Sequence, residues 1–435
     1  MNEAATELSA YRDAFETGAK SKREPAWLAE ERAAALARFE TLGFPTRRQE
    51  LWRFTNLSAL TGAAFPPAPR PSKETLPGEL APHLLAGAEH CIQLIDGYVI
   101  ERLSKIGRLP AGAFAGSLAR AVEAQPDLAR AAFEVGDTAG AQPLAALNAA
   151  LFGDGFVLSL PAGAVLEQPL QVVYAGGGGS HSFQARNLVA LGENSEATLV
   201  ETFIGAGTSW TNAVTQIQLA PGARLRHVVV QECGAEALQT ALYRLTLARG
   251  AHYESFTLNL GARLSRQDVQ VALTGESAVC ALNGATFLRD AQESTMATFV
   301  DHAAQGCTTR ETFKSVVDDR AHGVFLGKIA VRPGADKTDA NQLNRNLLLS
   351  PRAAVDTKPE LEILADDVKC SHGATVGDLD EAALFYLRSR GLDEIAARRM
   401  LIEAFAADAL DLAGTGAIRE LLGRRVQAWL EERGS

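Results

Sequence analysis

A cysteine and a histidine lie two residues apart near the C-terminal end, in the stretch DVKCSHGATVGDLD at 367–380. In an extended strand, Cys370 and His372 would point to the same face, about 7 Å apart along the chain. Thiolate and imidazole bind soft and borderline metals, and Gly373 would leave room for close approach. Because zinc sites and iron–sulfur clusters generally take about four protein ligands, this pair can supply only part of a metal site.

Both residues also have an ordinary structural interpretation. Free cysteines are often small buried hydrophobes, and a histidine beside a helix start can serve only as a hydrogen-bonding group. His302, Cys307 and His322 are weaker candidates still, because core positions would account for all three. The metal interpretation and the structural one therefore both stay open at this level.

Common nucleotide-binding and hydrolase motifs are absent from the sequence. The stretch GVFLGKIA at 323–330 resembles a phosphate-binding loop, but it is one residue short and has Ile329 where a magnesium-binding Ser or Thr is required. Patterns of the forms GxGxxG, HExxH and GxSxG do not occur. A group of charged strand residues would suit a β-helix enzyme acting on carbohydrate, although solvated strand faces carry such charges routinely. The group comprises Arg263, Arg266, Asp268, Arg289 and Asp290.

Composition places the chain among soluble proteins of two or three domains. Its 435 residues are 47% hydrophobic and 22% charged. The net charge of −10 argues against binding nucleic acid or an anionic membrane, and no apolar run is long enough to span a bilayer. The N-terminus lacks a signal-peptide pattern, and the five scattered cysteines form neither a disulfide framework nor a zinc motif. We therefore expect a reduced, cytoplasmic protein.

The first part of the chain is mostly helical in pattern. Residues 63–73 are rich in proline and predict a linker, and Asp96–Gly97 between two alternating apolar runs predicts a β-hairpin. The helical patterns lie at 3–18, 25–43, 114–134 and 143–151.

Short alternating strands replace the helices from about residue 155 to 366. A sequence pattern of a small residue, an alanine and an alternating strand recurs in steps of 26, 28 and 27 residues. Its alanines are Ala197, Ala223, Ala251 and Ala278. A fixed period in the high twenties without helices predicts a β-solenoid, in which each coil stacks on the next. A β-sandwich, which also has short alternating strands, stays as the alternative.

A solenoid has two open ends, whose unpaired strand groups must be capped or paired. The N-terminal helices would cover one end, and the other, near 340–370, is a natural place for edge-to-edge pairing with a second solenoid. Helical patterns return afterwards, opened by a capping box of Asp378 and Glu381. Apolar and basic residues there either form a small core or dock a partner. They are Phe385, Tyr386, Ile395, Leu401 and Phe405, with Arg388, Arg390, Arg398 and Arg399.

Two stretches resemble a known family. They are VFLGKIAVRPGADKTDANQLNRNLLLSPRAAVDTKPELEILADDVKCSHGATVGDLDEAALFYLRSRGL at 324–392 and RRQELWRFTNLSAL at 47–60. Both are similar to the SufB/SufD family of iron–sulfur cluster assembly proteins. Together they cover both ends of the chain and, through the repeat, most of its length.

The resemblance implies a mainly β fold, a right-handed parallel β-helix (β-solenoid) flanked by N-terminal and C-terminal α-helical domains. We expect a helical domain with a Pro-rich linker at 1–90 and a β-helix at 91–366, with a helical insert near 110–151. A C-terminal helical domain would follow at 367–435.

The resemblance also implies partners and a cargo. The chain would pair with SufB through the β-helix ends and bind SufC, an ABC-type ATPase, through its C-terminal helices, to build a nascent iron–sulfur cluster. In the family the motif histidine, His372 here, is implicated in cluster assembly at the interface with SufB, and Cys370 matches the motif cysteine. SufB supplies a key cysteine from a stretch corresponding to 341–350, where this chain has none. Reduced flavin is associated with such complexes, although the sequence has no flavin motif.

We therefore expect a non-catalytic scaffold subunit rather than an enzyme. In isolation it can form a homodimer through an exposed terminal coil. Two alternatives from other classes stay open, the carbohydrate-active β-helix enzyme and a structural assembly subunit without metal contact.

Overall fold

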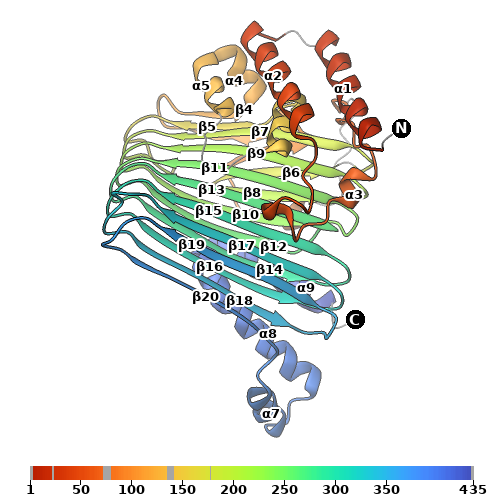
Figure 1. Cartoon of the computed structure of the whole chain (residues 1–435), viewed down its shortest axis with the longest axis vertical. Coiled ribbons are helices and arrows are strands. Elements are labelled where there is room, and N and C mark those ends of the chain that lie inside the picture. The colour runs from red at the N-terminus through yellow and green to blue at the C-terminus, as the bar shows by residue number, and fades with distance from the viewer. Residues whose placement is uncertain (1–2, 22–23, 72–79, 135–141, 177, 433–435) are drawn as a thin grey trace.

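The chain folds into a solenoid of two facing parallel β-sheets, with helices at both ends. Figure 1 shows it as a computed structural model, which describes residues 3–21, 24–71, 80–134, 142–176 and 178–432. From β5 (Phe156–Leu160) onward, successive strands alternate between the two sheets, so the chain crosses from one sheet to the other after each of these strands. The solenoid makes about eight turns. The prediction of a mainly β solenoid flanked by helices is confirmed.

We call the sheets I and II. Sheet I contains β1 (His90–Ile95), β2 (Tyr98–Val99), β3 (Lys105–Ile106), β6 (Leu170–Gly176), β8 (Glu196–Gly205), β10 (Arg224–Cys233), β12 (His252–Asn259), β14 (Val279–Leu288), β16 (Thr308–Val317), β18 (Asp339–Leu348) and β20 (Lys369–Gly377). Sheet II contains β4 (Phe114–Ser117), β5 (Phe156–Leu160), β7 (Ser182–Leu191), β9 (Trp210–Leu219), β11 (Leu238–Leu247), β13 (Leu264–Leu273), β15 (Glu293–His302), β17 (His322–Val331) and β19 (Ala354–Ile363).

The sequence repeat corresponds to one corner of each coil. Each strand of sheet I from β8 to β18 follows a left-handed residue and then a buried, mostly small residue whose carbonyl accepts a hydrogen bond from the next coil. The buried residues are Ser195, Ala223, Ala251, Ala278, Cys307 and Thr338. The left-handed positions are Asn194, Gly222, Gly250, Ser277, Gly306 and Lys337. The register aligns Ser195 with Ala223, not Ala197 as the sequence suggested, because both corner residues directly precede their strands.

Antiparallel strands close the N-terminal end of the solenoid. Strand β4 pairs antiparallel with β5, and β2 and β3 pair antiparallel with β1. Asp96 and Gly97, both with positive φ, make the turn between β1 and β2, so the predicted hairpin is confirmed. Within the described ranges, this end of the solenoid therefore has no open parallel edge.

The N-terminal helices lie over sheet II. Helix α2 packs on α6, which in turn contacts β7 and β9. The helices and short helical turns of this part are α1 (Glu3–Ser21), α2 (Ala26–Leu42), η1 (Glu50–Trp52), α3 (Ser58–Thr61), η2 (Ala81–His83), α4 (Leu118–Ala124), α5 (Pro126–Arg130), η3 (Ala131–Phe133) and α6 (Pro143–Leu151). None of the helices in the described ranges is both long and apolar enough to cross a membrane.

The Pro-rich stretch 63–73 is not a free linker where the structure describes it. Pro66 O and Ala68 N–H each bond to the main chain of Ser182 at 2.9 Å, so this stretch lies along β7. Phe65 and Ala68 are buried there, so the proline content of the stretch alone wrongly predicted a free linker. The last two residues of the stretch lie outside the described ranges.

The C-terminal helices are α7 (Glu381–Ser389), α8 (Glu394–Leu410), η4 (Asp411–Ala413) and α9 (Gly416–Glu432). Helices α8 and α9 share an apolar cluster with the outer face of sheet I, whereas α7 has no buried residue and extends beyond the last coil (Figure 1). Sheet I continues through β20, past the expected boundary at 366. The helix cap is therefore Asp380, which accepts bonds from the N–H groups of Ala382 and Ala383, rather than Asp378.

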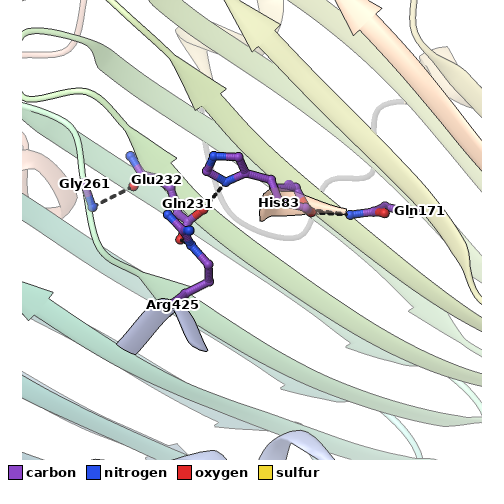
Figure 2. Close-up of polar contacts among 7 residues, drawn as sticks. His83, Gln171, Gln231, Glu232, Gly261 and Arg425 are labelled. Carbon is purple, nitrogen blue, oxygen red and sulfur yellow. Dashed lines mark hydrogen bonds and ion pairs between the residues drawn. The ribbon is translucent and has the colours of Figure 1, made fainter. Parts of the chain in front are cut away.

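Glu232 joins three separate parts of the chain at the end of β10 (Figure 2). Its carboxylate contacts His83 Nδ1 of η2 at 2.5 Å and the guanidinium of Arg425 in α9. The Gln171 amide of β6 bonds the carbonyl of His83 at 2.8 Å and so holds the same turn. Because the side chain of Glu232 is 5% exposed, this junction fixes α9 on sheet I.

Candidate functional site

The last coil, β19 and β20, is the exposed end of the solenoid, and we call it the terminal coil. Strand β19 pairs only with β17, and β20 pairs only with β18. Neither strand contains a fully buried residue, in contrast to the mostly buried strands before them. A strand edge with unpaired N–H and C=O groups can pair with a strand of another chain.

The open edge of β20 is free of the features that usually block strand pairing. Lys369 N–H donates to Thr338 O at 2.8 Å, so by alternation the main chains of Cys370, His372 and Ala374 face the open edge. Strand β20 contains no proline, and its single lysine stands at its start. Strand β19 differs, because it carries Pro359 and several charged residues. The accessible edge of sheet I is therefore the better pairing surface.

The structure places Cys370 and His372 together on β20. They lie opposite Ala340 and Gln342 of β18. Cys370 is half-buried and packs against the end of the core between the sheets, whereas the other four cysteines are buried. His372 is exposed and, two residues further on, lies on the same side of the strand. A cysteine and a histidine thus lie two residues apart on the same side of β20, at the accessible end of the core.

The electrostatic environment keeps the cysteine protonated in the chain alone. Burial raises the pKa of the Cys370 thiol above its ordinary value. At neutral pH the group is therefore a neutral thiol, and it acts as a ligand only when a bound metal displaces its proton. Gly373 is not needed for space, because an added Cβ would meet only Leu343 Cδ1 at an ordinary 3.5 Å.

The described residues do not complete a metal site in this chain. They contain no group of three or more His, Cys, Asp or Glu side chains placed to hold a metal ion. The pair on β20 can therefore supply at most two ligands to a metal. That Cys370 and His372 form part of a metal site stays a prediction.

A buried polar column lies directly beneath His372. Gln342, its neighbour in register, donates from Nε2 to Glu311 Oε2 at 2.7 Å, and Thr298 donates to the same oxygen at 3.0 Å. Burial raises the pKa of Glu311 to about 7. Gly327 makes room for the amide, because a Cβ there would lie 2.1 Å from Gln342 Nε2.

Sequence analysis missed Gln342 and Glu311. Both occupy inward positions one and two coils before His372, but the spacings of 30 and 31 residues differ from the repeat detected earlier. The signal that could have identified them is the column of inward positions, once the corner residues fix the register. Gln342 Oε1 has no hydrogen-bond partner among the described residues and so remains available as an acceptor.

The weaker candidates have structural roles. His302 is buried, contacts Thr309 Oγ1 at 2.8 Å, and has its pKa lowered to about 4 by burial. Cys307 is one of the buried corner residues, and His322 contacts Asp356 at 2.8 Å. The GVFLGKIA stretch lies inside β17 and is not a strand-to-helix turn, so it does not form a phosphate-binding loop.

The charged group considered for carbohydrate chemistry does not converge on a cleft. Arg266 is 1% exposed, forms an ion pair with Asp268 at 2.7 Å and stacks on Trp52 of η1, with 3.7 Å from its guanidinium carbon to the ring centroid. Arg263 is exposed, and Asp290 lies at a coil corner. Arg266 and Asp268 therefore anchor the N-terminal segment to sheet II.

The C-terminal helices expose a second surface, on α7 and the start of α8. Phe385 and Ile395 are 75% and 76% exposed, and Tyr386 and Met400 are also exposed. Arg388 and Arg398 both contact Glu394 in the same region. Large exposed apolar side chains gathered on one surface are typical of protein-binding surfaces.

Comparison with known families shows which protein family the chain belongs to. A family model described as "SUF system FeS cluster assembly, SufBD core domain" matches residues 173–405, and one described as "SufBD protein N-terminal region" matches 84–172. The chain belongs to the SufBD family. The core match spans the solenoid from β6 to the terminal coil and continues into α8.

Individual SufBD relatives align with nearly the whole chain. The iron–sulfur cluster assembly protein SufD of Escherichia coli is 30% identical over 394 residues, covering 88% of each chain. An iron–sulfur cluster assembly SufBD family protein of Synechocystis is 32% identical over 408 residues, covering 90% of this chain and 88% of the relative. The family resemblance identified in the sequence is confirmed, and with it a connection to iron–sulfur cluster assembly.

Proposed function

We propose that this chain is a non-catalytic scaffold subunit of an iron–sulfur cluster assembly complex, with SufB and the SufC ATPase as its partners. The observation that carries the proposal is the terminal coil, where an open strand edge, Cys370 and His372 occur together. The cluster is the cargo of the complex, and this chain supplies only part of its binding site.

SufB pairs with the open edge of β20 in this proposal. Strand addition there would place its main chain beside Cys370 and His372, whose own main-chain groups face the edge. Ligands from SufB would then complete the set that this chain leaves unfilled. Such a site forms only when the two subunits meet, which couples assembly of the complex to assembly of the cluster.

His372 is the ligand we assign to the nascent cluster, and Cys370 is its helper. The histidine is exposed and needs no rearrangement, whereas Cys370 must first lose a proton that burial retains. Gln342, one strand spacing of about 4.8 Å away, has a free carbonyl oxygen suited to orienting the imidazole.

SufC binds the exposed surface of α7 and α8 in this proposal. The sequence of this chain has no nucleotide-binding motif, so ATP hydrolysis belongs to the partner. Movement of the C-terminal helices with SufC would be transmitted to the terminal coil, because β20 runs into α7 within a few residues. We assign no residue of this chain to the reduced flavin associated with such complexes.

Reconstitution with SufB and SufC of the source organism tests the proposal. Ala374→Pro removes an N–H that faces the open edge, so we expect it to lose SufB while it retains SufC. Ala374→Ser is the matched control and should retain both partners. Ile395→Ser should lose SufC only, because it removes an apolar side chain from α8.

His372→Ala separates the ligand role from a purely structural one. We expect an intact complex whose iron and sulfide content falls about tenfold, with a smaller loss for Cys370→Ser. Unchanged cluster formation in an intact His372→Ala complex would remove the ligand assignment and leave a structural assembly subunit. Failure of the unaltered chain to co-purify with SufB would contradict the scaffold proposal itself.

A further inference from the structure

A pocket far from the terminal coil lies between the N-terminal helices and the outer face of sheet II. Its volume is about 650 Å³, within the range of small-molecule sites. Its walls come from α2, α6, β7 and β11. The charged residues lining it are Glu31 and Arg38 of α2, Arg186 of β7 and Arg244 of β11.

Arg244 is buried in this pocket, and the described residues offer it no partner. The residue is 8% exposed, and its Nε is shielded from solvent with no hydrogen-bond acceptor among the described residues. No acidic side chain in the described ranges pairs with it, and the charge it experiences most is another cation, Arg38. Burying an unpaired guanidinium is unfavourable unless something compensates its charge.

Arg186 repeats the pattern beside it. Its guanidinium donates to the neutral acceptors Ala132 O at 2.8 Å and Asn148 Oδ1 at 3.1 Å, and it lies over the ring of Phe133. Burial, with Arg244 and Arg38 nearby, lowers the pKa of Arg186 to about 9. The group is still charged at neutral pH, and no described carboxylate forms an ion pair with it.

The other buried arginines show what the pocket lacks. Arg32 bonds Glu24 at 2.9 Å, and Arg266 bonds Asp268 at 2.7 Å. The arginines that the structure buries are therefore either paired with a carboxylate or placed in this pocket. If Arg244 had only a structural role, we would expect a carboxylate on α2 or α6 to pair with it, as in the other two cases. The missing negative charge therefore points to a ligand.

The pocket also has an apolar floor. It consists of Phe133 of η3 with Ala145, Ala146 and Ala149 of α6. Three arginines against the single Glu31 leave the lining with a net positive charge. We propose that this pocket binds a small organic anion, with its apolar body on the floor and its negative group between Arg186 and Arg244. Nothing in the scaffold function requires this site, so the two proposals stand independently.

The test uses the full-length chain and a matched pair of fluorescent probes. The anionic probe is 1-anilinonaphthalene-8-sulfonate, and the neutral control is N-phenyl-1-naphthylamine, which lacks the sulfonate. Arg244→Met keeps the apolar volume and removes the charge, so we expect the Kd of the anionic probe to rise about tenfold or more. Binding of the neutral probe should change less than about twofold.

Two further variants keep the result interpretable. Arg388→Met makes the same change on the exposed apolar surface of α7 and should leave binding of the anionic probe unchanged. Arg38→Gln changes an exposed residue of α2, and should weaken that binding severalfold even if Arg244→Met fails to fold. Equal affinity of the parent for both probes, or unchanged anion binding in Arg38→Gln and in any folded Arg244→Met, would overturn the proposal.

Discussion

Glu311 is the most unusual residue in the solenoid interior. It is fully buried, and its contacts are with the neutral side chains of Thr298 and Gln342 rather than with a cation. Burial removes water from the Glu311 carboxylate, and its neutral contacts do not compensate the negative charge. The protonated form is therefore favoured, and the pKa of Glu311 rises to about 7. The residue lies two coils below His372, which ties the stability of this end of the core to pH.

Glu311→Gln should remove that pH dependence. In the unfolded chain the carboxyl titrates near 4.5, so between about pH 4.5 and 7 only the folded state holds the proton. Stability contributed by this group is therefore complete at low pH and falls as pH rises, by roughly 3 kcal/mol in total. In urea denaturation from about pH 5 to 8, the free energy of unfolding of the variant should rise relative to that of the parent by about this amount. The exposed Glu196→Gln should follow the parent, and parallel curves for Glu311→Gln would contradict the explanation.

Secondary-structure elements are held to the solenoid by single buried contacts as well as by apolar clusters. Helix α9 has both, because it shares a cluster with sheet I and places Arg425 on Glu232 (Figure 2). Turn η2 depends on the same carboxylate through His83. One side chain of β10 therefore positions segments from both ends of the chain.

Glu232→Gln should loosen α9 and η2 together. The amide keeps only one acceptor oxygen and no charge for Arg425 and His83, which contact the two carboxylate oxygens, and we expect a loss of about 2 kcal/mol, since both are partly exposed. Hydrogen exchange should quicken in α9 and around His83 while the amides of β10 stay protected. Glu254→Gln, which breaks the more exposed pair with Arg226, is the control and should cost less than about 0.5 kcal/mol. Equal effects of the two changes would show that Glu232 is not a junction.

The two ends of the whole molecule differ in their capacity to associate. Antiparallel strands and helices close the N-terminal end, whereas the C-terminal end stops at parallel edges (Figure 1). A solenoid that ends this way can bind another solenoid at that end only. The arrangement suits a subunit with one β partner, and it leaves that edge open when the partner is absent.

The isolated chain should consequently self-associate through β20. We expect a monomer–dimer equilibrium that sedimentation velocity detects as concentration increases, because the open edge can accept the same strand of a second copy. Ala374→Pro should shift it to monomer, and Ala374→Ser should not. A dimer that persists in Ala374→Pro would have to use another surface, such as the exposed side chains of α7.

Much of the fold is determined by sequence, because the chain repeats a local rule. A left-handed residue followed by a mostly small one turns one corner of six successive coils, and this pattern recurs often enough to predict a solenoid. The spacing of Cys370 and His372 likewise predicts a shared face, since two residues in a strand differ by one full alternation. Their shortage of ligands predicts that distant coils or another chain must complete any metal site.

Contacts between distant segments were decided only by the tertiary structure. The meeting of His83, Glu232 and Arg425 joins residues 149 and 193 positions apart, and no local pattern encodes it. The same holds for Arg186 and Arg244, whose missing carboxylates become visible only when α2 and α6 are packed on sheet II. Gln342 and Glu311 fall beneath His372 because variable corner lengths set the register. The sequence determines which chemical groups the chain carries and how neighbouring groups are spaced. Which of them are buried, and which side chains they contact, depends on which coils and helices pack together.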